Sequence, residues 1–187
     1  VSASENIQTP TVTIAGNAAA IATGSNGERV YTATYTMQSS DNTGVIPFTV
    51  DFSDMANNAG TQVTAVANDS DGGVTFDKQA PSFTAVTMSS NNSTSTLAIV
   101  NDVITINLTS DEAIKAGSDP TITVNGNTAT VTRNSTTSFT ATYTMSSPAD
   151  DAIDGSSIPI NISAYTDATG NAGTTVTTTT DGSAVTY

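Results

Sequence analysis

The sequence predicts an all-β protein made of two tandem β-sandwich domains. Apolar and polar residues alternate over short runs, and this period of two is typical of half-buried strands. Val, Ile and Thr, whose branched side chains favour strands, supply most of these runs. Most of the sequence also occurs as two similar copies, which indicates repeated units rather than one large domain.

The repeat is clearest in a strand-like segment near the middle of each copy. Residues 31–37 read YTATYTM, and residues 139–145 read FTATYTM. Five further pairs of segments correspond in the same order: 4–7 with 111–114, 10–17 with 120–127, 46–50 with 158–162, 54–60 with 167–173, and 73–76 with 184–187. Because the order is kept along the chain, we interpret the pattern as a tandem duplication.

The two copies predict domains at residues 1–78 and 79–187, joined at Asp77–Pro81. Pro81 has no N–H and biases Ala80 toward an extended conformation, so this linker should be short and straight. The first copy begins partway through its second expected strand, and we therefore expect the first domain to lack its N-terminal strand. Two explanations stay open: the chain is part of a longer array, or another chain supplies the strand.

In the second copy, strands are expected at 81–90, 102–110, 121–124, 128–132, 139–145 and 158–164. Turn residues such as Asn125-Gly126 and Asp181-Gly182 separate the runs, and no segment has sustained helical periodicity. About seven short strands over roughly 100 residues are typical of an immunoglobulin-like sandwich. A jelly roll or a barrel is the alternative architecture.

Charge and composition exclude several classes of partner. The chain has 17 acidic and 4 basic residues, a net charge of −13, so it lacks the basic surface that nucleic acids and anionic membranes require. No apolar run is long enough to cross a bilayer, so we expect no membrane insertion in this segment. The absence of Cys excludes disulfides and thiolate metal sites, and the excess of carboxylates favours divalent cations.

Composition also argues against an enzyme. The chain has no His, which removes Ser–His triads and the commonest general base. Paired carboxylates can hydrolyse glycosides, but there is no Trp to stack on a sugar ring. The ten Phe and Tyr residues lie mostly at alternating strand positions, where we expect them to be core. Clusters such as Asp150–Asp154 and Asp69–Asp71 are expected to be solvated loop acids.

Four motifs carry a resemblance to a known family: SENI at 4–7, YTATYTM at 31–37, DMANNAG at 54–60 and VTFDKQAP at 74–81. Together they resemble the tandem immunoglobulin-like repeats of large prokaryotic surface proteins, of the adhesin or surface-layer type. The resemblance implies an extracellular location, extended arrays and, in some members, Ca²⁺ between domains. The linker also resembles that of cadherins, with Lys78 and Gln79 in place of acidic residues.

Immunoglobulin-like topology would gather several acidic loops at one end of the second domain, beside the linker. We predict a Ca²⁺ site there, because Ca²⁺ takes 6–8 oxygen ligands. The predicted ligands are Asp77, Asp111, Glu112, Asp167 and Asn171, with Asp41 contributed by the first domain if the domains stack end to end. The alternative for Asp54 and Asp167, which open the DxxxNAG motifs, is that each caps its own turn.

These observations favour a structural, non-enzymatic segment of an extracellular cell-surface protein. Its domains would be rigid spacers in an adhesin stalk or a surface-layer array, with a joint stiffened by Ca²⁺. Its partners would be neighbouring domains of the same or identical chains. Two alternatives stay open: a subunit that exchanges strands within a lattice or fibre, and a Ca²⁺-dependent module that binds surface glycans.

Overall fold

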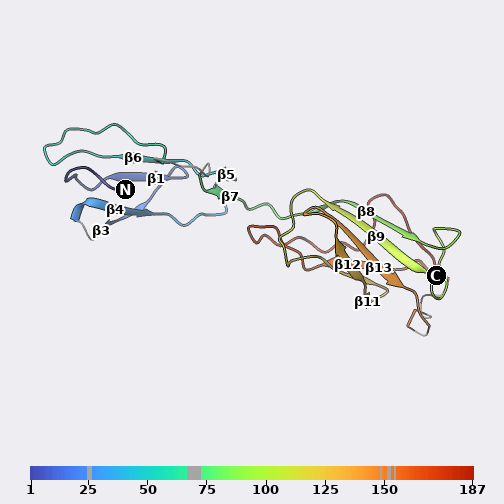
Figure 1. Cartoon of the computed structure of the whole chain (residues 1–187). Helices are drawn as coiled ribbons and strands as arrows, with labels where there is room; N and C mark the ends of the chain where they lie inside the picture. Colours follow the sequence, from blue (N-terminus) through green and yellow to red (C-terminus); the bar gives the residue numbers. More distant parts are fainter. Residues whose placement is uncertain (25–26, 67–72, 148, 151–152, 154) are drawn as a thin grey trace. The chain divides into compact units, whose positions relative to one another are not determined.

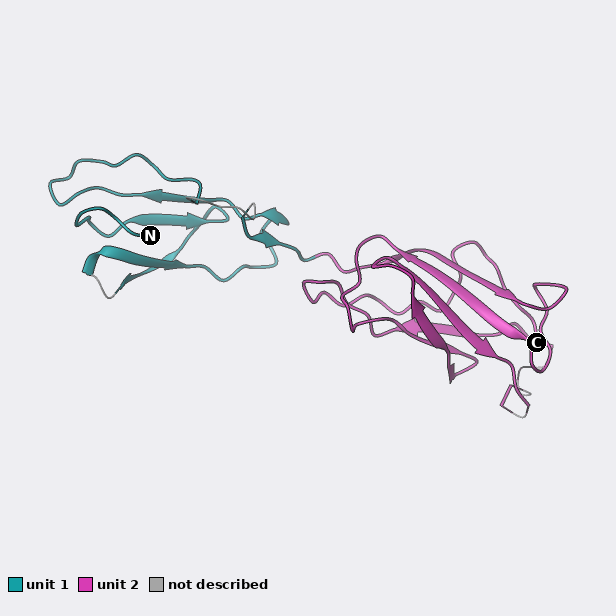
Figure 2. Cartoon of the chain, in the orientation of Figure 1, with its two compact units in different colours: residues 1–78 teal, residues 79–187 magenta. Residues whose placement is uncertain are grey.

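The structure is a computed structural model that describes residues 1–24, 27–66, 73–147, 149–150, 153 and 155–187. These residues form an all-β protein of several antiparallel sheets, as the sequence predicts (Figure 1). The chain divides into two compact units, Val1–Lys78 and Gln79–Tyr187, which we describe separately (Figure 2). Among the described residues, no helix has the length and apolar character needed to cross a membrane.

The described residues of the second unit form two sheets. The larger has the order β12-β13-β9-β8 and is formed by β8 (Phe83–Ser90), β9 (Val103–Ser110), β12 (Thr130–Arg133) and β13 (Ser138–Thr144). The smaller has the order β11-β10-β14 and is formed by β10 (Thr121–Val124), β11 (Asn127–Thr128) and β14 (Ile160–Ser163). All of the pairings are antiparallel.

One apolar core lies between the inward faces of these sheets. Alternate residues of β9, among them Ile104 and Ile106, are fully buried, as are Ile122 of β10 and Ile162 of β14. All four belong to the same cluster of buried apolar side chains. Because each fully buried Ile contributes about 1.5–3 kcal/mol, this shared core fixes the two sheets face to face. The arrangement is consistent with a β-sandwich.

The strand that the sequence predicts at 128–132 is in fact two strands, because the chain changes sheets at Ala129. β11 pairs with β10 in the smaller sheet, whereas β12 pairs with β13 in the larger one. Ala129 is buried at the crossing, and its N–H donates to the carbonyl of Ile122 (2.9 Å). Alternation alone does not show this change, since the period of two continues through it.

The described residues of the first unit also form seven strands, but these lie in three sheets of at most three strands each. Its sheets are β2-β1-β6, β3-β4 and β5-β7. The strands are β1 (Thr11–Ile14), β2 (Asn17–Ala18), β3 (Ala20–Gly24), β4 (Gly27–Thr34), β5 (Gly44–Val45), β6 (Phe48–Asp51) and β7 (Thr75–Phe76). The crossing also recurs: between β2 and β3, the N–H of Ala19 donates to the carbonyl of Val12 (2.9 Å).

The units differ in what pairs with β4 and with its counterpart β13. In the second unit β13 lies between β12 and β9, and β9 pairs in turn with β8. In the described part of the first unit, β4 pairs with β3 and otherwise forms only a bridge between Val30 and Ser2. Val1–Ala3 thus occupies the place of the end of β9, and no described strand of this unit corresponds to β8.

Candidate metal centre

Two loops of the second unit carry four of the six predicted metal ligands, and the backbone holds these loops together. The first loop follows β9 and carries Glu112; the second follows β14 and carries Asp167. Ile114 forms an antiparallel bridge with Asp167, and the N–H of Lys115 donates to the carbonyl of Thr166 (2.9 Å). As a result, carboxylate oxygens of Glu112 and Asp167 lie within 4.8 Å of each other.

Asp167 caps its own turn, one of the two roles that the sequence predicts for it. The side chain is buried, and its Oδ1 accepts hydrogen bonds from the N–H groups of Gly170 (2.6 Å) and Asn171 (2.8 Å) and from the hydroxyl of Thr169 (2.9 Å). Its Oδ2 accepts from the Asn171 amide (2.7 Å). Burial raises the pKa of this carboxyl, but the hydrogen bonds, led by the one from the Asn171 side chain, outweigh it and leave the pKa below 3.8.

Asp54 does the same in the first unit. Its Oδ1 accepts from the N–H groups of Ala56 and Asn58, both at 2.8 Å, and its Oδ2 accepts from the Asn58 amide (2.7 Å). The Asn58 side chain is the main reason that the pKa of Asp54 is lowered. The first Asp and the Asn of the DxxxNAG motif are therefore a carboxylate and the amide that holds it.

The final Gly of the motif is required by an aromatic ring. A Cβ at Gly173 would lie 1.9 Å from the ring of Tyr165, and one at Gly60 would lie 2.2 Å from the ring of Phe52. The Tyr165 hydroxyl donates to the carbonyl of Thr174 (2.8 Å), which fixes the buried ring beside the turn. The Asp, the Asn and the final Gly of the motif therefore each have a structural explanation in both units.

Asp111 joins the first loop to the beginning of β8. Its two carboxylate oxygens accept from the N–H and the hydroxyl of Ser82, both at 2.8 Å, and its own N–H donates to the Ser82 carbonyl (2.9 Å). The hydrogen bond from the Ser82 backbone is the main cause of the lowered pKa of Asp111. Asp111 is therefore already engaged within the unit.

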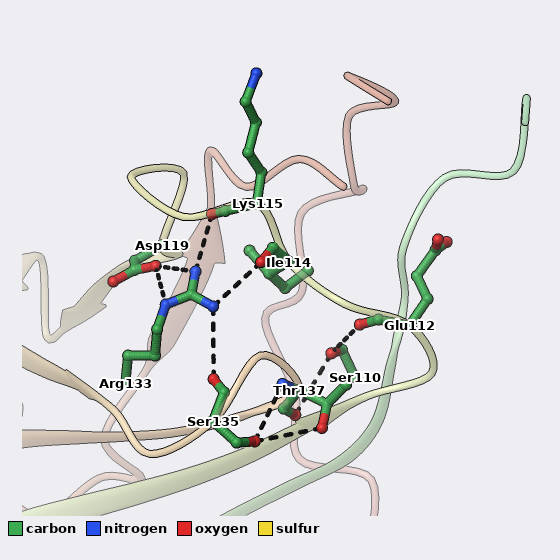
Figure 3. Close-up of polar contacts among 8 residues, drawn as sticks. All are labelled: Ser110, Glu112, Ile114, Lys115, Asp119, Arg133, Ser135 and Thr137. Carbon is green, nitrogen blue, oxygen red and sulfur yellow. Dashed lines mark hydrogen bonds and ion pairs between the residues drawn. The ribbon is translucent and has the colours of Figure 1, made fainter. Parts of the chain in front are cut away.

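Arg133 organises the same loop from the end of β12 (Figure 3). Its guanidinium forms an ion pair with Asp119 and donates to the carbonyls of Ile114 (3.1 Å) and Lys115 (2.9 Å). It also lies over the ring of Phe139, 4.9 Å from the ring centroid. Sequence reasoning missed this residue, although Arg133 is the only arginine of the second copy and so the only candidate for such a fork of donors.

Figure 3 shows the Glu112 carboxylate pointing away from the Arg133 cluster, although both belong to the same loop region. Glu112 is half-buried, and its carbonyl accepts from the Ser110 hydroxyl (2.6 Å). The loop is therefore held by its backbone, which leaves the Glu112 side chain directed to the side of Asp167.

In the first unit, Asp41 belongs to a local network rather than to an open acidic surface. It is buried, and it accepts hydrogen bonds from the Gln38 N–H (2.7 Å), the Asn17 amide (3.1 Å) and the Tyr35 hydroxyl (3.2 Å). Asp77 follows β7 and is half-buried. The approach of Asp41 and Asp77 to the second-unit carboxylates stays a prediction.

The expectation for Asp150 is wrong, because this residue is a fully buried acid and not a solvated one. It accepts from the Ser146 N–H (2.8 Å), the Asn125 amide (2.9 Å) and the Tyr143 hydroxyl (3.0 Å). Burial and the nearby carboxylate raise the pKa of Tyr143. A run of acidic residues predicts exposure to solvent, but Tyr143, seven residues earlier, donates a hydrogen bond to Asp150 in a buried position. The other acids for which exposure was predicted, Asp69, Asp71, Asp151 and Asp154, lie outside the described residues.

Within the second unit, a cation would draw on Glu112 and on the less occupied Oδ2 of Asp167. Each carboxylate oxygen of Asp111 already accepts a hydrogen bond from Ser82, and the Asp167 Oδ1 accepts three hydrogen bonds. Ca²⁺ takes 6–8 oxygens, so this unit alone supplies too few side-chain ligands. The donor set fits a hard cation only if water or other parts of the protein complete it.

The two units use equivalent polar residues in the same way: Tyr35, Asp41 and Asn17 correspond to Tyr143, Asp150 and Asn127. The asparagine amide donates to the carboxylate in each case, at 3.1 Å in the first unit and 3.4 Å in the second. In comparisons with known proteins, no family model, no curated protein and no solved structure matches the chain.

Proposed function

We propose that the chain is a structural, non-enzymatic segment of an extracellular cell-surface protein, of the adhesin-stalk or surface-layer type. Its two units would be immunoglobulin-like spacers. The observation that carries this proposal is the Tyr–Asp–Asn network, which recurs in both units with the same partners. A hydrogen-bond network that is present in both copies stabilises each copy as a folded unit, which is what repeat architectures require.

The use of the acidic side chains supports the same function. Asp41, Asp54, Asp150 and Asp167 each accept at least three hydrogen bonds from residues of their own unit. A general acid or base needs access to substrate and a pKa near the working pH. The lowered pKa values of Asp54 and Asp167 are the opposite of what a general acid needs, and they suit groups that stabilise turns.

The spacer role predicts mechanical resistance. In the second unit, β9 lies between β8 and β13, paired along its length to both. Stretching the chain from its ends in single-molecule force spectroscopy should give a discrete unfolding event for this unit, because its paired strands must separate cooperatively. Gradual extension without a force peak would contradict the spacer role.

The proposed location has its own test. Antibodies against the chain should label intact cells of the source organism as strongly as permeabilised cells. Labelling that requires permeabilisation would contradict an extracellular location, while the mechanical result would still stand.

We also propose that Ca²⁺ binds at the acidic end of the second unit. The support is that carboxylate oxygens of Glu112 and Asp167 lie within 4.8 Å of each other. Asp111 and Asn171 lie in the same two loops, and Asp77 and Asp41 are the predicted ligands from the first unit. Calorimetric titration of the full chain with CaCl₂ should release or absorb heat, and Glu112→Gln should weaken binding about tenfold or more.

A matched control for this titration is Glu28→Gln, which changes one exposed carboxylate of the first unit that is not a predicted ligand. Equal weakening by both variants would indicate diffuse attraction to a chain of net charge −13 rather than a site. No heat with Ca²⁺, together with a melting temperature unchanged by chelator, would contradict the calcium proposal and leave the spacer function untouched.

A further inference from the structure

The first unit has an apolar face that its own described strands leave uncovered. A cavity of about 560 Å³ opens there, lined among others by Val12, Ile14, Ala33, Phe48 and Val74. None of the described residues that line it is acidic or basic. Val45 and Val74 on its rim are 62% and 72% exposed, unusual values for β-branched apolar residues in strands or beside them.

The second unit shows what covers the equivalent face. There, β9 and β8 pair in succession beside β13 and place five apolar side chains over the opposite sheet: Val86, Met88, Ile104, Ile106 and Leu108. The comparison is direct at one position. The backbone of Val1 is hydrogen-bonded to Tyr31, and at the equivalent position of the second unit Leu108 pairs with Phe139. Val1 is 50% exposed, whereas Leu108 is 1% exposed.

The residues that line this face are also more exposed to solvent in the first unit than in the second. Val124, Ala141 and Ile160 are buried in the second unit. Their counterparts in the repeat, Ile14, Ala33 and Phe48, are all partly exposed. The sequence thus keeps the apolar lining of a sandwich core in the first unit, although the described strands there do not close it.

The edge of β4 also presents backbone groups in the right register. Tyr31 and Val1 exchange hydrogen bonds in both directions, at 3.0 and 2.9 Å. In an antiparallel ladder such pairs recur at every second residue, so the next pair on this edge would be formed by Ala33. Its counterpart Ala141 pairs with Ile106 of β9, whereas no described residue pairs with Ala33 on that side.

We propose that the open face of the first unit binds a polypeptide β-hairpin with the pattern of β8 and β9. The occupant has two antiparallel strands that alternate apolar residues with Ser, Thr or Asn. Its inner strand pairs with β4 beyond Tyr31, and its apolar residues fill the cavity. The second unit does not compete for this hairpin, because the outer edge of its own β8 is capped: the N–H groups of Val86 and Met88 donate to the hydroxyls of Thr180 (2.9 Å) and Ser183 (2.8 Å).

The test adds a synthetic peptide with the sequence of residues 81–107 to the full 187-residue chain and follows amide hydrogen exchange by NMR. The peptide ends at Asn107 because Val1 already occupies the next position of the ladder. We expect exchange at Ala33 to slow by about tenfold or more. Exchange at Ala141 should not change, since its ladder is already complete, and this residue is the internal control.

A control peptide carries Ile104→Asp and Ile106→Asp, which place charges at the positions that would enter the cavity. It should leave exchange at Ala33 unchanged. In a second arm, residues 81–107 are fused directly ahead of Val1, so that aggregation of the free peptide cannot decide the result. The fused chain should protect Ala33 and raise the melting temperature.

Three results would overturn the proposal. Exchange at Ala33 is as fast in the fused chain as in the unmodified one; the control peptide protects Ala33 as well as the first peptide does; or the unmodified chain already protects Ala33 in step with dimer formation measured by light scattering. The last result would show that a second copy pairs with the β4 edge instead.

Discussion

At the scale of single residues, the molecule depends on buried carboxylates that hold loops. Asp150 is the clearest example: it has no exposed surface, and four donors from two parts of the second unit converge on it. Removing such an acceptor leaves donors without partners in a place that water does not reach, and this costs more than the net value of the bonds themselves.

Asp150→Ala should therefore destabilise the second unit by about 1–3 kcal/mol. Because the chain divides into two compact units, the measurement is native-state hydrogen exchange at the β13 amides, which belong to the second unit. Asp181→Ala is the control, since Asp181 is exposed and accepts a hydrogen bond from the nearby N–H of Ser183. Similar losses in the two variants would contradict the importance of burial.

A second residue-scale prediction concerns the β1–β2 turn. Ala15 and Gly16 both have positive φ, at 52° and 80°, as do Asn125 and Gly126 at 48° and 77°. Alanine is strained in this region, and asparagine is preferred in such two-residue turns. Asn125 also donates to Asp150, a bond that Ala15 cannot make to Asp41.

Ala15→Asn should stabilise the first unit by about 1 kcal/mol, because it relieves the strain and adds a donor for Asp41. Slower hydrogen exchange at the β1 and β4 amides would show the gain. The reverse change at the matching position, Asn125→Ala, should destabilise the second unit. Destabilisation of the first unit by Ala15→Asn would refute the turn assignment.

At the scale of elements, the loop that contains Asp167 links folding to pH. The pKa of the Asp167 carboxyl in the folded state lies below the usual 3.8, so the unfolded chain binds this proton more tightly. The contribution to stability is therefore complete above pH 3.8 and is lost as pH falls through the lower folded value.

We expect the stability of the second unit to fall steeply on acidification below about pH 4, and Asp167→Asn to flatten this part of the curve. Urea denaturation at a series of pH values between about 2.5 and 6, a range that spans the ordinary pKa of Asp, measures how steeply the free energy of unfolding depends on pH. Asp119→Asn is the comparison, since it replaces another carboxylate of the same unit. A curve for Asp167→Asn as steep as that of the parent chain would contradict the role of the hydrogen bonds to Asp167.

At the scale of the whole molecule, the two units should differ in stability. Among the described residues, 19 apolar side chains are buried in the second unit. In the first unit four are buried: Ile7, Val12, Tyr31 and Val50. Since apolar burial is the main stabilising contribution to folding, the first unit should open more often.

Limited proteolysis should therefore cleave the first unit before the second and leave a resistant fragment that begins near Gln79. Mass spectrometry of the digest identifies the fragment. If the hairpin of residues 81–107 is fused ahead of Val1, cleavage in the first unit should slow. Loss of the second unit first would contradict the ranking of the two cores.

The sequence by itself determined the class of fold, the repeat and most strands, because alternation and branched side chains are local signals that survive in a linear pattern. It placed β10 at its observed bounds and β9 and β13 within two residues. It also offered turn capping for Asp54 and Asp167, since an Asp followed four residues later by Asn is a local unit.

Only the tertiary structure decided the sheet change at Ala129, the burial of Asp150, the role of Arg133 and the open face of the first unit. Each of these depends on segments far apart in the chain: Arg133 reaches Ile114 and Lys115, and Tyr143 and Asn125 meet at Asp150. A linear pattern records which residues are apolar or charged. Which neighbours surround them in three dimensions, and so whether a carboxylate is solvated or a valine covered, is set by packing.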